Sequence, residues 1–104
     1  MKKASAEQVQ AWKKKYDCKI FEFTAHKQGE EEDKVAYFRT ITPEVLEAWQ
    51  QTRKKSMLQA DEIIIENCWI DGDDCIRYRN EYKQGLRDWL AVLLDKVEGE
   101  MVEL

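Results

Sequence analysis

Residues 19–41 read KIFEFTAHKQGEEEDKVAYFRTI, and this stretch decides the fold class. KIFEFT (19–24) alternates, with Phe21 and Phe23 on one side, and KVAYFRTI (34–41) alternates in the same way. Such alternation is typical of a strand that buries one face. A polar segment with one glycine and four acids joins the two runs. The pattern therefore predicts an antiparallel β-hairpin with a solvated tip.

Helix start signals flank the hairpin. Ser5 is a candidate N-cap for a short helix over residues 5–15, and Thr42 precedes a proline and a glutamate, which favours a second helix. Ser56 is placed to cap a third. Helical spacing of the apolar residues in 57–70 favours a helix, although three consecutive isoleucines also suit a buried strand, so both structures stay open there.

The C-terminal part of the chain has the clearest helical period. Apolar residues from 78 to 97 recur at i, i+3, i+4 and i+7 and predict one long amphipathic helix: Tyr82, Leu86, Trp89, Leu90, Leu93, Leu94 and Val97. Residues 98–104 are a candidate flexible tail. The chain is thus expected to be an α+β protein, an antiparallel β-hairpin packed against three to four helices, in a single domain over residues 1–104.

Composition narrows the classes of function. A net charge of −4 argues against nucleic-acid binding, which depends on neutralising phosphates. No apolar run approaches the roughly 18 residues that span a bilayer, and the N-terminus lacks the apolar segment of a secretory signal. Three cysteines without a CxxC pair favour a reducing compartment, so a cytoplasmic location is expected.

The segment ENCWIDGDDC, residues 66–75, resembles a metal site but fails the tests for one. Aligning its glycine with position 6 of a calcium loop puts Trp69 at position 3, which needs an oxygen ligand, and Tyr78 at position 12, which needs a bidentate glutamate. For zinc, only three scattered ligands exist: Cys68, Cys75 and His26. We therefore expect a helix end and an Asp-Gly turn, no metal and no cofactor, and little effect of Asp73→Asn.

No catalytic residue emerges from the sequence. The single histidine, His26, lies on the expected hairpin tip, and no phosphate-binding loop or nucleophile motif is present. Four tryptophans are many for a small acidic chain, and large aromatic residues are enriched at protein interfaces. These features favour a non-enzymatic, partner-binding protein. The candidate partner-binding residues are Trp49, Trp89, Leu93, Val97 and Met101.

Several short motifs add a resemblance that covers roughly residues 12–94. They are Ala36-Tyr37-Phe38-Arg39, Ala60-Asp61-Glu62-Ile63-Ile64, Asn67-Cys68-Trp69-Ile70, Gly72-Asp73 and Ile76. In this order they resemble the small tail assembly chaperones encoded by tailed phages and prophages. The resemblance implies a cytoplasmic, non-catalytic factor of the host cell that binds the long helical tape-measure protein while the tail tube polymerises, and it transfers no catalytic residue.

Two other classes stay open at this level. A small acidic cation-binding or regulatory protein would use the acids of residues 30–33 or 71–74. A small enzyme would need a concave pocket with convergent titratable groups. A homo-oligomer is a further alternative for the assembly class, because the apolar C-terminal face continues into the tail.

Overall fold

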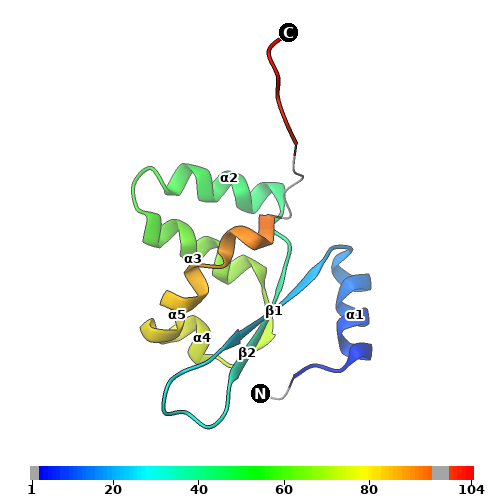
Figure 1. Ribbon diagram of the computed structural model, residues 1–104, viewed down its shortest axis with the longest axis vertical. Coiled ribbons are helices and arrows are strands. Elements are labelled where there is room, and N and C mark those ends of the chain that lie inside the picture. Colours follow the sequence, from blue (N-terminus) through cyan, green and yellow to red (C-terminus); the bar gives the residue numbers. More distant parts are fainter. Residues whose placement is uncertain (1–2, 95–98) are drawn as a thin grey trace.

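The chain folds into a three-stranded antiparallel sheet with helices on both faces, as described by a computed structural model for residues 3–94 and 99–104 (Figure 1). The elements in chain order are α1 (Ala6–Tyr16), β1 (Ile20–Ala25), β2 (Lys34–Arg39), α2 (Pro43–Thr52), α3 (Met57–Cys68), β3 (Trp69–Gly72), α4 (Cys75–Tyr78), α5 (Asn80–Arg87) and the 3₁₀ helix η1 (Leu90–Leu94). The α+β class expected from the sequence is confirmed.

The predicted hairpin forms the first two strands of the sheet. β1 and β2 pair without interruption from Ile20 opposite Arg39 to Ala25 opposite Lys34. The sheet order is β1-β2-β3, so β2 is central. β3 pairs antiparallel with β2, and its register shifts next to Tyr37.

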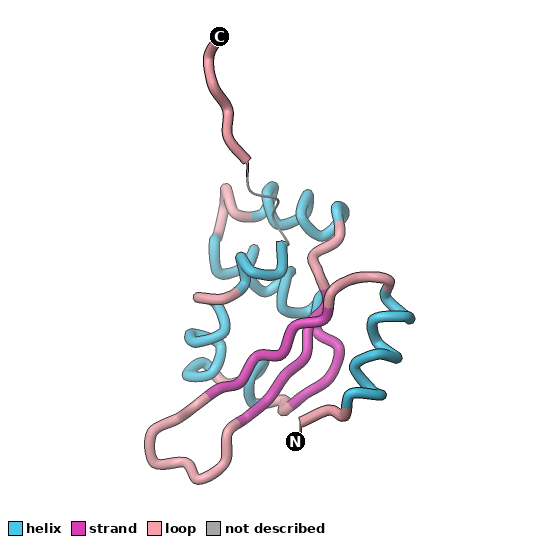
Figure 2. Tube along the Cα trace, turned by 45° about the vertical axis from the view of Figure 1, so that its right-hand side comes forward, coloured by secondary structure: helices cyan, strands magenta, loops and turns pink. Residues whose placement is uncertain are grey.

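The central strand β2 carries a core on each side. On one face α1 covers the sheet, where the Trp12 and Tyr37 rings lie 5.1 Å apart (Figure 1). The remaining helices gather on the other side of the sheet, as the view in Figure 2 also shows. The buried side chains of that larger core are Ala36, Phe38, Ile41, Ile64, Ile65, Cys68, Ile76, Tyr82, Leu86, Leu90 and Leu93.

The three predicted helix caps are present. The hydroxyls of Ser5, Thr42 and Ser56 each accept a hydrogen bond from the amide three residues later, at 3.1, 3.3 and 3.2 Å. Each cap satisfies an amide that the first helical turn leaves without an intrahelical partner. The helix starts at α1, α2 and α3 are therefore fixed by local sequence.

The helix end expected within residues 66–75 is present, but Asp71 and Gly72 belong to a strand and not to the expected turn. α3 ends at Cys68, and the chain passes directly into β3, with Trp69 already in extended geometry. The Trp69 ring meets Phe38 edge-on at 5.5 Å, so pairing with β2 draws this segment into the sheet. The segment 57–70, left open between helix and strand, contains both. A strand this short has too few residues for an alternation of apolar and polar side chains to be recognised in the sequence.

The expected long C-terminal helix is also corrected. The segment divides into α4, α5 and η1, because Arg79 is extended and the α-helix ends at Arg87. The Ile41 amide donates to the Leu93 carbonyl at 2.9 Å, which ties η1 to the chain before α2. The apolar spacing still identifies the core, since Tyr82, Leu86, Leu90 and Leu93 are all buried. Val97 lies outside the described residues.

A close backbone contact joins β3 to β2. Gly72 has φ +150°, and a Cβ added there would lie 2.5 Å from the Ala36 Cα and 2.6 Å from the Val35 carbonyl oxygen. Distances this short are not accommodated by side-chain movement, because both atoms belong to the central strand. Only glycine fits this position.

We expect Gly72→Ala to lower the free energy of unfolding by roughly 2–4 kcal/mol, because β3 must move away from β2 to admit the methyl group. Urea denaturation followed by circular dichroism measures this change. Gly99→Ala is the matched control, because an added methyl at Gly99 meets no atom within 4 Å. Equal stability of the two variants would contradict the role assigned to Gly72.

Asp73 closes the same junction through hydrogen bonds in both directions. Its amide donates to the Val35 carbonyl at 2.8 Å, and its carboxylate accepts from the Val35 amide at 2.9 Å. Burial raises the pKa of Asp73, but the hydrogen bonds it accepts and nearby positive charge outweigh burial, so the pKa lies below its ordinary value. Asp73 is therefore a structural residue, which a reading of residues 66–75 as a turn did not indicate.

Asp73→Ala is expected to cost about 1–2 kcal/mol at neutral pH, because the buried Val35 amide loses its acceptor. Asp73→Asn keeps an acceptor oxygen and should lose less. Because the folded pKa is depressed, the contribution of the carboxylate is complete above the unfolded pKa of about 3.9 and declines as pH falls through the lower folded value. Denaturation of wild type and both variants at pH 7 and pH 3 checks this, and a pH-independent difference for Asp73→Ala would count against it.

Candidate functional site

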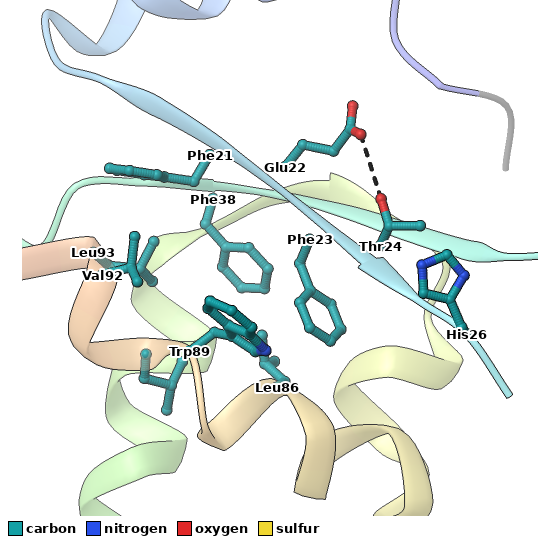
Figure 3. A pocket seen from close by; sticks show the side chains of 11 residues that line it. Phe21, Glu22, Phe23, Thr24, His26, Phe38, Leu86, Trp89, Val92 and Leu93 are labelled. Carbon is teal, nitrogen blue, oxygen red and sulfur yellow. Dashed lines mark hydrogen bonds between the residues drawn. The ribbon is translucent and has the colours of Figure 1, made fainter.

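An apolar groove of about 460 Å³ lies between β1 and the α5–η1 segment (Figure 3). We call it the β1 groove. Its lining residues are Phe21, Glu22, Phe23, Thr24, His26, Phe38, Leu86, Trp89, Leu90, Val92 and Leu93.

Aromatic side chains from two directions form the walls of the β1 groove. Phe21 and Phe23 point into it from β1, and Trp89 stands opposite on the turn between α5 and η1 (Figure 3). The Trp89 side chain is 61% exposed and Val92 is 48% exposed. Large apolar side chains this exposed beside a groove are a feature of binding surfaces.

A smaller hollow of about 270 Å³ continues from the β1 groove along the C-terminal end of β1. It shares Phe23, Thr24, His26 and Trp89 with the groove and adds Ala25, Lys27, Glu81, Tyr82, Gly85 and Asp88. The groove therefore continues along β1 toward the hairpin loop, where its lining becomes partly charged.

Ion pairs between α3 and α5 hold the helical wall of the groove. The Lys83 ammonium lies 2.7 Å from the Glu62 carboxylate, and Arg87 lies 3.5 Å from the same carboxylate and 3.8 Å from Asp61. These side chains are half-buried, so solvent screens them less than an exposed pair. Trp89, two residues after Arg87, is thus presented from a fixed position.

The structure separates the five residues predicted to bind a partner. Trp89 stands at the β1 groove, and Leu93 is only 4% exposed, so Leu93 contributes to its floor. Trp49 lies in a different hollow, between α2, α3 and η1, where its indole N–H donates to Asp61 at 3.4 Å. Met101 is fully exposed in the C-terminal segment, and Val97 is not among the described residues.

Sequence reasoning missed Phe21, Phe23 and Val92 as part of a binding surface. The alternation of β1 placed the two phenylalanines on one face, and that face was taken to be buried by helices. The signal that could have located the groove is that β1 lies at the sheet edge, where the helical layer leaves its aromatic side chains half-buried.

The polar residues near the groove are arranged for structure. Glu22 and Thr24 point away from the aromatic side chains (Figure 3), and Glu22 accepts from the Tyr37 hydroxyl at 2.9 Å. Burial raises the pKa of Glu22, but the bonds from Tyr37 and Lys3 lower the pKa by more. His26 is exposed and lies 2.8 Å from Asp33 in the hairpin loop. The walls of the groove therefore offer apolar burial.

The cysteines and acids considered as metal or nucleophile candidates lie apart. Burial raises the pKa of the Cys68 thiol to about 11, so this thiol is protonated at neutral pH. Cys75 is half-buried, and neither forms a disulfide. Within residues 3–94 and 99–104, no three side chains of His, Cys, Asp or Glu come together in a way that could hold a metal ion.

Comparisons with models of protein families, with curated proteins and with solved structures found no match. In the part of the chain that the structure describes, none of the helices has the length and apolar character needed to cross a membrane.

Gly85→Ala is expected to raise the free energy of unfolding by up to about 1 kcal/mol, because alanine is the better helix former in α5. The added methyl would lie 3.9 Å from the Phe23 ring, an ordinary van der Waals distance. Thermal denaturation measured by calorimetry checks the direction of this change in stability. A lower melting temperature than wild type would show that α5 and β1 pack more closely than described.

Proposed function

We propose that this protein is a non-catalytic assembly chaperone or adaptor that binds a helical partner protein in the β1 groove. The proposal places the apolar stripe of an amphipathic partner helix between Phe23 and Trp89. Burying such a stripe in a groove is an established mode of helix recognition. The observation that carries the proposal is the exposed Trp89 ring beside a preformed apolar groove.

The electrostatics of the chain support a protein partner. The groove walls are apolar, while the chain as a whole has a net charge of −4. A surface that binds nucleic acid would instead need basic side chains lining the groove. Arg87 and Lys83, the cations on the adjacent helix, are engaged with the acids of α3.

The more specific part of the proposal is a role in phage or prophage tail assembly in the cytoplasm of a bacterial host, with a tape-measure-like protein as partner. Its support is the order of short motifs from residues 36 to 76 that resembles tail assembly chaperones. In the structure these motifs form β2, the middle of α3 and the β3 junction. The motifs therefore coincide with the framework that positions the groove.

Binding of a tape-measure-like helical protein to the full chain tests this function. Isothermal titration calorimetry should detect binding by wild type, and Trp89→Ala should weaken the affinity at least about tenfold, because an aromatic anchor is lost from the interface. Trp89 is mostly exposed, so the substitution should leave the fold intact.

Tyr78→Ala is the matched control for this experiment. Tyr78 is 68% exposed on α4 and lies outside the β1 groove, so its removal should leave the affinity unchanged. Absence of binding by the wild-type chain, or equal weakening by both substitutions, would contradict the proposal.

A further inference from the structure

We infer that the C-terminal segment of a second copy of this chain binds as an added strand beside β1, so that two copies exchange residues 99–104 and form a dimer. This inference goes beyond the proposed function: it uses the same groove but concerns the chain without any other protein. It rests on the edge of the sheet, the position of the groove and the composition of the segment.

β1 is an edge strand without the usual protection against strand addition. It has six regular pairs with β2, no proline and a single charged residue, Glu22. The opposite edge, β3, has four residues, an irregular register and Asp71. Natural proteins protect sheet edges with short strands, irregular pairing and charge, and β1 has little of this.

The β1 groove lies along that open edge. Phe21 and Phe23 belong to one face of β1 and Glu22 and Thr24 to the other, yet all four line the groove. A groove lined by both faces of an edge strand follows its backbone. An extended segment placed there can hydrogen-bond to β1 and insert alternate side chains under Trp89.

Residues 99–104 have the properties that such a site needs. They form no helix or strand and run away from the rest of the molecule (Figure 1). Met101, Val102 and Leu104 are 100%, 73% and 117% exposed. The segment therefore carries apolar side chains that its own chain does not cover.

One antiparallel register places the apolar residues of the segment against apolar residues of β1. Placing Leu104 opposite Phe23 puts Val102 opposite Ala25, so Leu104 enters the groove and Val102 enters the adjoining hollow, because alternate residues share a face. The same register places Glu103 opposite Thr24. It also brings Glu100 toward Lys27, which lines the adjoining hollow and already pairs with Glu81 at 3.4 Å. A second copy covers two grooves and two segments at once, with the closed symmetry typical of dimers.

Sedimentation velocity of residues 1–104 without any other protein tests the dimer. Wild type should reach twice the monomer mass of 12.4 kDa as concentration rises. Val102→Asp with Leu104→Asp should raise the dissociation constant at least about tenfold, because charge cannot be buried in the groove. Gln51→Asp with Gln59→Asp adds the same charge at exposed positions elsewhere and should leave it unchanged. A strictly monomeric wild type, or a dimer insensitive to the C-terminal substitutions, would overturn the inference.

Two further variants test the register and the exchange. Thr24→Glu should weaken the dimer by facing Glu103, whereas Thr24→Lys should strengthen it. Circular dichroism confirms that each variant is folded. Mixing the C-terminal variant with Val92→Asp should restore a mixed dimer, because one intact groove then meets one intact segment. Equal effects of the two Thr24 variants, or no mixed dimer, would exclude this arrangement.

Discussion

The contact between β3 and β2 at Gly72 holds the molecule together. A glycine there lets the β3 backbone lie against Ala36, and Asp73 then pairs with Val35 in both directions. Because α4 and α5 follow this junction directly, its geometry determines where the second half of the chain begins. The ion pairs from Glu62 and Asp61 then hold α5 against α3, and Trp89 comes to lie opposite β1. The groove is therefore a consequence of how the third strand docks.

The uneven cover of the sheet explains why a binding surface exists at all. The central strand β2 is almost entirely buried, with Ala36, Tyr37 and Phe38 each at most 1% exposed. β1 has the same alternation but receives only the edge of the helical layer. Its aromatic side chains are thus half-buried and available to a ligand. If both a partner helix and a second copy use this surface, occupation by one excludes the other, and the concentration of the chain sets which prevails.

The parts of the fold that depend on local chemistry could be predicted from the sequence. The hairpin follows from alternation, and the starts of α1, α2 and α3 follow from Ser5, Thr42 and Ser56. The buried positions of the last segment follow from its period, although its division at Arg79 does not, because tertiary contacts such as the Ile41–Leu93 hydrogen bond decide it. β3 could not be predicted, because four residues are too few to show a period. The groove could not be predicted either, because the position of β1 at the sheet edge depends on the order of the strands. Trp89 was found by composition, whereas Phe21 and Phe23 needed the structure.

The Val35–Asp73 hydrogen bonds also set an order in time. They join residues 38 positions apart, so closing this loop costs more chain entropy than closing the hairpin, whose strands are neighbours in sequence. The hairpin and the capped pair α2–α3 contain mainly local contacts and can form early. Formation of α3 brings the two ends of the Val35–Asp73 loop closer together. Docking of β3 is therefore expected after α3 and the hairpin have formed, and the Ile41–Leu93 hydrogen bond, which closes a longer loop, is expected to form later still.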